Sequence, residues 1–483
     1  MTRDWRDELI DELRAVVARQ QAEIDLLKKR VAELEERLNK SSRNSSMPPS
    51  SDGPSKSKRQ RPRRKRGRRK PGGQPGHEKH DREWVPTEQV DQVTVVKPEQ
   101  CERCSKPLVE YNRDPVRHQH VELPSVKPWV HEHQLHAGWC PDCEAWTPAK
   151  LPEGIPSRGF GPSVDAVVGT LLGVYRLSKR AVVGLMAELF NLQMSVGAVV
   201  GCQRAVSDAL AGPVVEAHEH AQRQPVKNAD ETSWRQGLRR AWLWGLVTAP
   251  VTVFMIHLDR SAQAARELLG KAVGILGTDR YSGYGWWPLR LRQVCWAHLS
   301  RDFTAISERG ATSKRIGQAL LREAERMFVW WQRVREGTLT RSTFQVYLRP
   351  LQRRVQRLLE QGTGAAEAKT ARTCTKILKV LPALWTFARV EGVEPTNNSG
   401  ERAVRHGVIY RKISYGTHSE WGSRFVERIL TVHASCKQQG RSAVAFVRQA
   451  CEAVLTRSPP PSLVPIPVRE HIDSQDHELP IAA

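Results

Sequence analysis

The chain has 483 residues and a formal net charge of +23 at pH 7, which predicts a polyanionic partner such as double-stranded DNA. No uninterrupted apolar run of 18 residues occurs in the sequence, and its first residues are charged rather than signal-like. We therefore expect neither a membrane partner nor export. The length allows about three domains. Nine cysteines, four of them in CxxC pairs, favour metal binding in a reducing compartment over disulfides.

Residues 8–40 are predicted to form a coiled coil that makes a dimer. The seam residues alternate three and four positions apart, and all but Gln20 are apolar: Ile10, Leu13, Val17, Gln20, Ile24, Leu27, Val31, Leu34 and Leu38. β-Branched residues dominate the first core position and Leu the second, which favours a parallel dimer. The alternative is an amphipathic helix that packs on its own domain.

Residues 41–97 are predicted to be a disordered basic linker, because Ser, Asn, Pro and Gly are frequent in its first half and apolar residues are nearly absent there. Eleven of the fifteen residues from Lys56 to Lys70 are Lys or Arg. This block should bind DNA phosphates without sequence preference and with strong salt dependence. Its centre consists of Arg63, Arg64, Lys65 and Arg66. A merely solvated charge run is the alternative, and the two interpretations are compatible.

Residues 98–150 are interpreted as a zinc-binding module. Two CxxC pairs flank 35 residues, a pattern that suits one structural Zn²⁺ held by four thiolates. The expected ligands are Cys101, Cys104, Cys140 and Cys143. The segment has little other apolar mass, so its fold should depend on the metal.

Residues 160–222 are predicted to be helical, with one helix from Pro162 to Tyr175. Ser178 should cap a second helix that ends at Phe190, and Ser195 a third that ends near Leu210. This spacing resembles a helix-turn-helix DNA-binding domain. Its candidate DNA contacts are Gln203, Arg204 and Ser207. The alternative is that the three helices pack against the next domain.

Residues 223–290 read as three strands, a helix and a fourth strand. The first strand is predicted to end on Asp230, and the strand from Val273 to Thr278 ends next to Asp279. The intervening elements are 241–247, 253–258 and a helix between its cap Ser261 and Gly270. Two carboxylates at the carboxyl ends of neighbouring strands repel each other unless a divalent cation lies between them. Alternatively, each aspartate caps the turn that follows it.

Residues 395–456 supply a third carboxylate. Glu401 lies in the first turn of a predicted helix, where it would complete a capping box with Asn398. That explanation does not account for the basic residues that follow, which suit phosphate contact: Arg402, Arg405, Arg411 and Lys412. Further helices are expected at 419–437 and 442–455, and the Pro-rich residues 457–483 should form a disordered tail.

The 121 residues between Asp279 and Glu401 exceed what a compact core needs, so residues 291–394 are predicted to be a helical insertion. Helices are expected at 313–334, 342–360 and 365–390, the last one kinked at Pro382. Cys295 and His298 form a CxxH near its start. Two ligands alone do not make a zinc site.

Seven motifs in this order resemble those of the insertion-sequence-66 type of DDE transposases: NSSMPPSSDG, GGQPGH, ADETSW, TDRYSGY, CWAHLSRDF, TNNSGERAVR and FVERILTV. They span most of the chain. The resemblance implies a multidomain protein with an α/β RNase H-like catalytic core in which Asp230, Asp279 and Glu401 form the catalytic triad. It also implies that the CxxH supports the active site. The family more often has His where this chain has Asn228.

This resemblance implies a transposase of the bacterial cytoplasm, associated with the nucleoid. Such an enzyme binds the terminal inverted repeats of its element and carries out cleavage and strand transfer with two Mg²⁺ or Mn²⁺ ions. A homodimer or higher oligomer and accessory proteins of the same element are expected partners. Two alternatives stay open: a non-catalytic, dimeric, zinc-containing DNA-binding regulator, and an RNase H-like nuclease without strand transfer.

Overall fold

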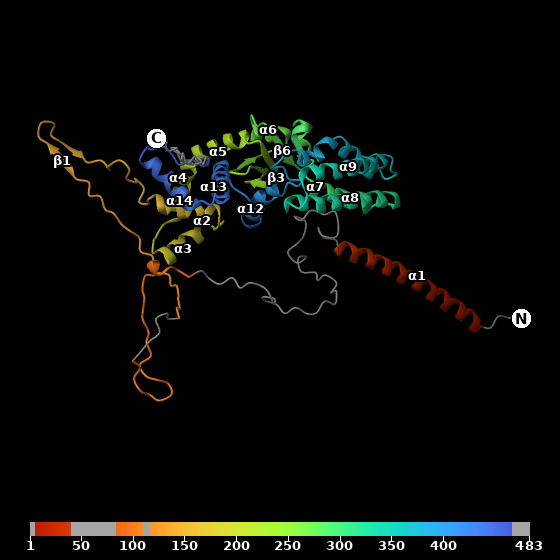
Figure 1. Cartoon of the computed structure of the whole chain (residues 1–483), viewed down its shortest axis with the longest axis horizontal. Coiled ribbons are helices and arrows are strands. Elements are labelled where there is room, and N and C mark those ends of the chain that lie inside the picture. Colours follow the sequence, from red (N-terminus) through yellow and green to blue (C-terminus); the bar gives the residue numbers. More distant parts are fainter. Residues whose placement is uncertain (1–4, 40–83, 110–115, 466–483) are drawn as a thin grey trace, which may run out of the picture.

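A five-stranded mixed sheet organises residues 226–294. The computed structural model describes residues 5–39, 84–109 and 116–465 (Figure 1). Strands β3 (Val226–Gln236), β4 (Arg239–Val247) and β5 (Thr252–His257) are antiparallel, whereas β6 (Ile275–Thr278) and β7 (Arg292–Val294) run parallel to β3. Their order in the sheet is β5-β4-β3-β6-β7. The central strand β3 therefore has an antiparallel neighbour on one side and a parallel one on the other.

Strand β3 is longer than the sequence predicts. It was expected to end on Asp230, but it stays paired with β4 as far as Gln236. Its parallel pairing with β6 ends much earlier, at Asn228 and Gly277. Asp230 and Asp279 each lie two residues past that last pair, so the register brings them to the same place. The expected juxtaposition of the two aspartates is present, although only Asp279 lies at a strand end.

Serine caps begin the helices where the sequence predicts them. Ser178 accepts a hydrogen bond at the start of α3 (Lys179–Phe190), Ser195 does so for α4 (Val196–Ala209), and Ser261 for α6 (Ala262–Leu269). Gly270 ends α6 with a φ of +51°, a conformation that favours glycine. These boundaries follow from local chemistry, which is why the sequence identifies them well.

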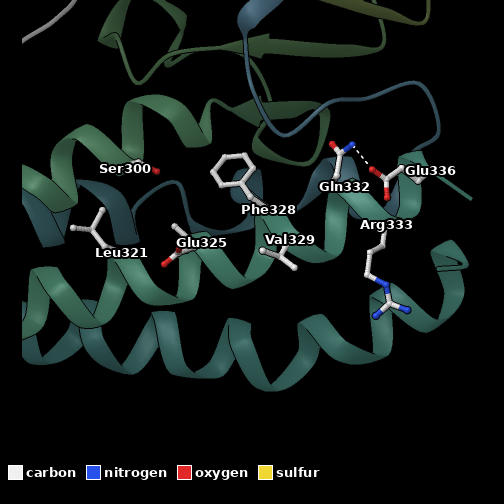
Figure 2. Close-up of a pocket in the computed structure, with 9 residues that line it drawn as sticks. Ser300, Leu321, Glu325, Phe328, Val329, Gln332, Arg333 and Glu336 are labelled. Atoms are coloured by element: carbon white, nitrogen blue, oxygen red, sulfur yellow. Dashed lines mark hydrogen bonds between the residues drawn. The ribbon is translucent and has the colours of Figure 1, made fainter. Parts of the chain in front are cut away.

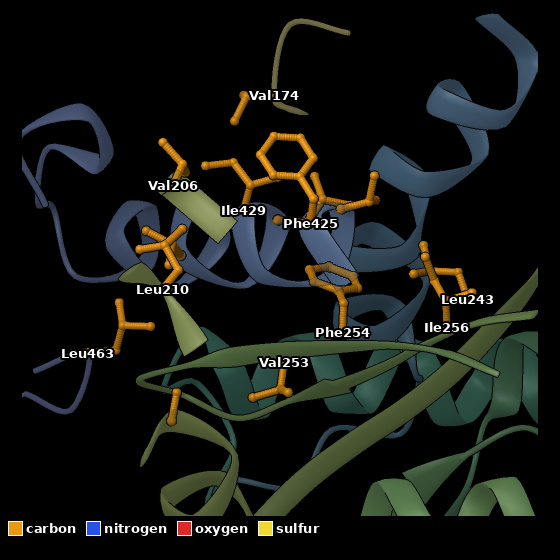
Figure 3. Close-up of a cluster of buried hydrophobic side chains, with 14 of the residues drawn as sticks. Val174, Val206, Leu210, Leu243, Val253, Phe254, Ile256, Phe425, Ile429 and Leu463 are labelled. Carbon is orange, nitrogen blue, oxygen red and sulfur yellow. The ribbon is translucent and has the colours of Figure 1, made fainter. Parts of the chain in front are cut away.

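The helices before the sheet share its hydrophobic core. α2 (Pro162–Gly173), α4 and α5 (Ala211–Arg223) pack with α13 (Glu420–Gln438) and α14 (Ala443–Leu455) in one apolar cluster that includes β4 and β5. Figure 3 shows members of this cluster from α4, β5, α13 and the junction of α4 and α5: Val206, Leu210, Phe254, Phe425 and Ile429. The described structure thus matches the packing alternative for residues 160–222.

The tail is ordered at its beginning, contrary to the prediction of disorder from residue 457. Leu463 is fully buried in the same cluster (Figure 3). The side chain of Gln439 donates a hydrogen bond of 2.7 Å to the Leu463 carbonyl, and Arg441 donates one of 2.9 Å to the Ser462 carbonyl. Residues 466–483 lie outside the described part of the chain.

Side chains of helix α13 form hydrogen bonds with backbone N–H groups at the outer edge of β5. Ser435 and Thr431 accept hydrogen bonds of 3.1 and 3.0 Å from the backbone N–H groups of Thr252 and Phe254, and Glu427 accepts one from the next such group, of Ile256. Four helical residues rise about 6 Å. Two strand residues rise about 6.8 Å. The two spacings nearly match, so one helix face can pair with alternate amides of β5 and block its edge.

The insertion forms a second apolar cluster built by α7 (Trp296–Ser307), α8 (Ala311–Arg335), α9 (Arg341–Thr363), α10 (Ala368–Leu378) and α11 (Thr386–Arg389). The helix expected over residues 365–390 is broken rather than kinked. α10 stops at Leu378, and residues 381–384 form a 3₁₀ turn that contains Pro382, which has no N–H for an α-helical bond. A shallow, largely apolar groove of about 760 Å³ runs along α8 beside Phe328 and Val329 (Figure 2).

Helix α12 (Asn398–Ser414) returns to the sheet and lies against β3 and β4. Gly407 permits a close approach, because a Cβ there would lie 2.0 Å from Leu243 Cδ2. The side chain of Asn397, just before the helix, accepts a hydrogen bond of 2.8 Å from Asn228 Nδ2 and donates one of 2.8 Å to the Ala229 carbonyl. Asn397 thereby fixes the start of α12 to β3 beside Asp230.

The N-terminal elements are partly described. The predicted coiled-coil segment is a single helix, α1 (Trp5–Asn39), whose seam residues Leu13, Val17 and Leu27 are more than half exposed in the single chain. Dimerisation stays a prediction. A hairpin of β1 (Ala137–Cys140) and β2 (Ala145–Pro148) carries one CxxC pair. Within the described residues, no helix is long and apolar enough to cross a membrane.

Replacing Asn397 with Ala should lower the free energy of unfolding by roughly 2–4 kcal/mol, because two buried hydrogen bonds to β3 are lost and the Ala229 carbonyl is left without that partner. The matched control is Asn398→Ala at the exposed neighbouring position, which should cost much less. Urea unfolding of both variants measures the difference. A larger loss at Asn398 than at Asn397 would contradict this role of Asn397.

Candidate active site

Three carboxylates from separate elements interact at one edge of the sheet. Asp230 comes from β3, Asp279 follows β6, and Glu401 lies in the first turn of α12. Burial raises the pKa of Asp230 to about 8, and the negative charges of Glu231, Asp279 and Glu401 add to this effect. The convergence of Asp230, Asp279 and Glu401 is the arrangement that the sequence motifs imply.

The negative charge of Glu231, a residue that the sequence analysis did not single out, is balanced by neighbouring side chains. Arg260 donates two hydrogen bonds, of 3.0 and 2.7 Å, to its Oε1, and Tyr284 donates one of 2.7 Å to Oε2. Arg260 is itself held over the ring of Tyr281, at 4.1 Å from the centroid. Both oxygens of Glu231 therefore have partners, and its charge is balanced locally. Its place next to Asp230 in the ADETSW motif was the available signal.

The Asp279 carboxylate has a structural role and is also accessible from a cavity. Its Oδ1 accepts a hydrogen bond of 2.8 Å from the backbone N–H of Tyr281, so the turn-capping alternative is correct for one oxygen. The buried guanidinium of Arg292 fixes the backbone by donating 2.8 Å to the Asp279 carbonyl. Asp279 also lines a cavity of about 360 Å³, together with Arg280, His298, Arg301, Asp302 and Ala305. This cavity gives an external ligand access to the carboxylate.

Glu401 is not used as a helix cap. The N-cap is Asn397, which makes no side-chain capping bond, so the expected capping box with Asn398 is wrong. Instead, Glu401 Oε1 lies 3.3 Å from Nδ1 of His298 and 3.8 Å from the guanidinium of Arg301. The carboxylate thus faces His298 and Arg301 of α7, which line the cavity beside Asp279.

The CxxH lies directly beside Glu401. Cys295 is the N-cap of α7, and its Sγ accepts a hydrogen bond of 3.1 Å from the backbone N–H of Asn397. Burial raises the pKa of the Cys295 thiol, which the backbone N–H groups around it oppose. Burial and the charge of Arg301 lower the pKa of His298, whereas the charges of Asp279 and Glu401 oppose this shift. Sequence reasoning alone found only two residues here, because Glu401 joins them from more than 100 residues away.

The basic residues of α12 divide into two groups. Arg402, Arg405 and Lys412 are exposed and free to meet a phosphate backbone. Arg411 is half-buried and donates hydrogen bonds to the carbonyl and hydroxyl of Ser233, the former at 2.7 Å. It therefore attaches α12 to β3, and a DNA contact by Arg411 stays a prediction.

The candidate recognition helix α4 presents few free side chains. Gln203 and Ser207 are buried, and Ser207 accepts hydrogen bonds from Arg428 of α13. The structure thus corrects the expectation that Gln203 and Ser207 contact DNA. Arg204 is exposed and lies over the ring of Trp421 at 5.5 Å. Arg63, Arg64, Lys65 and Arg66 lie outside the described residues.

The four CxxC cysteines form two separate turns rather than one cluster. Cys101 belongs to a tight turn in which its carbonyl accepts 2.8 Å from the Ser105 N–H, and Cys140 ends β1 at the hairpin turn. Backbone N–H groups in each turn lower the pKa values of the Cys101 and Cys140 thiols. Among the described residues, the groups with metal-ligand spacing do not include these cysteines. Each pair has the features of half a site, and the expected four-cysteine cluster is not assembled in the chain alone.

Comparison with known proteins identifies the family of this chain. Residues 2–83 match a family of unknown function, DUF6444. An uncharacterized protein, y4qI, of Sinorhizobium fredii is 26% identical over 246 residues, which cover 44% of this chain and 43% of that protein. The chain thus matches less than half the length of this relative. Residues 170–425 match the Transposase IS66 family. Because this match covers more than half of the chain and includes all three carboxylates, the protein belongs to the Transposase IS66 family.

Proposed function

We propose that the protein is a DDE transposase that cleaves the ends of its DNA element and joins them to target DNA. The observation that carries this proposal is the meeting of Asp230, Asp279 and Glu401. Burial, together with the negative charges of Glu231, Asp279 and Glu401, raises the pKa of Asp230 to about 8. A protein gains nothing in stability from carboxylates that repel one another. Their convergence beside a cavity that Asp279 lines is therefore best explained by a positively charged ligand.

The three carboxylates fit Mg²⁺ or Mn²⁺, which prefer oxygen ligands. Two such ions bound here would activate the attacking hydroxyl and stabilise the leaving oxygen of a phosphodiester. The protein's contribution is to hold the three side chains in place. Asn397 fixes the start of α12 to β3, and Arg292 fixes the backbone at Asp279. The Arg260–Glu231 pair keeps a fourth carboxylate occupied, so it does not compete for a metal ion.

The strand order supports an RNase H-like assignment of this core. Three antiparallel strands are followed by two that run parallel to the first, and the insertion of α7–α11 separates the last strand from the helix with Glu401. DNA would approach along the exposed Arg402, Arg405 and Lys412. These side chains supply phosphate contacts that position DNA without reading its sequence. A dimer through α1 would hold two element ends together.

Replacing Asp230 with Asn should reduce Mg²⁺-dependent cleavage of duplexes carrying the ends of the element by about 10³-fold or more, since a metal-held carboxylate contributes several kcal/mol. Asp259→Asn is the matched control, an exposed aspartate just after β5 that should retain full activity. The rate of 3′-end release, measured on denaturing gels, checks both variants. Undiminished cleavage by the Asp230 variant would refute the triad.

The products of the wild-type reaction separate this proposal from its alternatives. A transposase joins the released 3′ ends to a second DNA molecule, whereas a nuclease releases them without joining. Specific binding of the element ends with no cleavage, even after addition of the element's other proteins, would favour the regulator.

We also propose that Zn²⁺ brings the two CxxC turns together as a four-thiolate site. The support is that backbone N–H groups already favour the thiolate forms of Cys101 and Cys140. Metal binding would then supply the folding free energy that this largely exposed segment lacks.

Replacing both Cys104 and Cys143 with Ser should remove one equivalent of bound zinc and the protection of residues 98–150 from amide exchange. Cys374→Ser, a buried thiol of the insertion, is the control and should leave both unchanged. Zinc content and exchange mass spectrometry measure the outcome. An unchanged zinc content in the double variant would exclude this site.

A further inference from the structure

Cys295, His298 and Glu401 form a compact group of metal-ligand type next to the candidate active site. One ligand atom of each residue, the sulfur, a ring nitrogen and a carboxylate oxygen, lies within 4.8 Å of the others. Around a tetrahedral Zn²⁺, with bonds of about 2.0–2.3 Å, such donors are roughly 3.5 Å apart. A shift of about 1 Å, which side-chain rotation provides, would bring the three donors to that distance.

Two of these donor atoms are buried and have no hydrogen-bond partner, although their side chains are partly exposed. His298 Nδ1 and Glu401 Oε1 face each other at 3.3 Å, yet neither forms a hydrogen bond of acceptable geometry in the described structure. Arg301 lies 3.8 Å from the same oxygen, which is too far for a hydrogen bond. Buried polar atoms without partners are rare and costly, and an absent ion is one of their ordinary explanations.

The third donor is held in place by the backbone. The Asn397 N–H donates to Cys295 Sγ at 3.1 Å, so the starts of α7 and α12 meet at this sulfur. This N–H leaves the sulfur lone pairs that do not accept it free to bind a metal ion. This placement explains why a cysteine, rather than another cap residue, suits the start of α7.

From these observations, we propose that Cys295, His298 and Glu401 bind a divalent ion of the zinc class. A thiolate and an imidazole select such an ion over Mg²⁺, which prefers oxygen. Three protein donors leave one coordination position open. His298 lines the same cavity as Asp279, so this position is accessible to water or to a phosphate oxygen. The ion would fix the orientation of Glu401, and the thiol releases its proton on binding.

This site goes beyond the proposed strand cleavage and does not depend on it. The donors differ from those of the proposed Mg²⁺ site formed by Asp230, Asp279 and Glu401, and only Glu401 is common to both sites. A carboxylate has two oxygens, so one can face Cys295 and His298 while the other faces Asp230 and Asp279. The simpler alternative is that Cys295 and His298 orient Glu401 by contact alone, with no ion.

Cobalt binding distinguishes the two explanations. The background protein is the full chain in which four cysteines are changed to Ser: Cys101, Cys104, Cys140 and Cys143. These changes remove the other proposed thiolate site. After metal removal, we expect this protein to bind one equivalent of Co²⁺ with a thiolate-to-cobalt charge-transfer band. Millimolar Mg²⁺ should not displace the ion.

Variants in this background identify the ligands. Cys295→Ser should abolish the charge-transfer band, and His298→Ala should weaken Co²⁺ binding at least about tenfold. Cys436→Ser, another buried thiol, is the control and should change neither. Thermal unfolding without metal verifies that each variant is folded, and His298→Ala alone decides the question if Cys295→Ser does not fold.

Two results would overturn the proposal: no cobalt band in the background protein, or a band of unchanged intensity in the Cys295 variant. The proposed DNA cleavage is tested separately, because Asp230→Asn should retain the cobalt band. A protein that binds cobalt through Cys295 but never cleaves DNA would leave this site in place and refute the transposase mechanism.

Discussion

Repulsion between carboxylates is the constraint on which the candidate active site depends. Asp230 and Asp279 meet because two strands share a parallel register, and Glu401 is added by a helix attached to the same strand. Burial, together with the negative charges of Glu231, Asp279 and Glu401, raises the pKa of Asp230 to about 8. The rest of the fold must hold these repelling carboxylates together. A bound cation would replace the net repulsion at this place with attraction.

The fold supplies that restraint through contacts between distant parts of the chain. Asn397 connects the start of α12 to β3, while the N-cap sulfur of α7 accepts a hydrogen bond from the same asparagine's backbone. Asn397 thus connects three parts of the site: the strand that carries Asp230, the helix that carries Glu401, and the CxxH. On the opposite side, α13 pairs with the edge amides of β5 and closes the sheet against further strand addition.

Sequence reasoning succeeded where the cause is local. Serine caps such as Ser261 and apolar strand runs fixed most element boundaries, and the motifs indicated all three carboxylates. It failed where tertiary packing decides: Gln203 is buried by helices that the sequence could not place, and Leu463 of the tail completes the core. The partners of Glu231 and the role of Asn397 depend on contacts across long sequence separations, which periodicity does not reveal.

The central claim is that Asp230, Asp279 and Glu401 together hold catalytic metal ions. Anomalous diffraction from crystals of the protein grown with Mn²⁺ and a DNA end measures this most directly. The account predicts two manganese peaks about 4 Å apart, both ligated by these carboxylates. An ordered Glu401 side chain directed away from Asp230 and Asp279, with no manganese peak between the three residues, would contradict it.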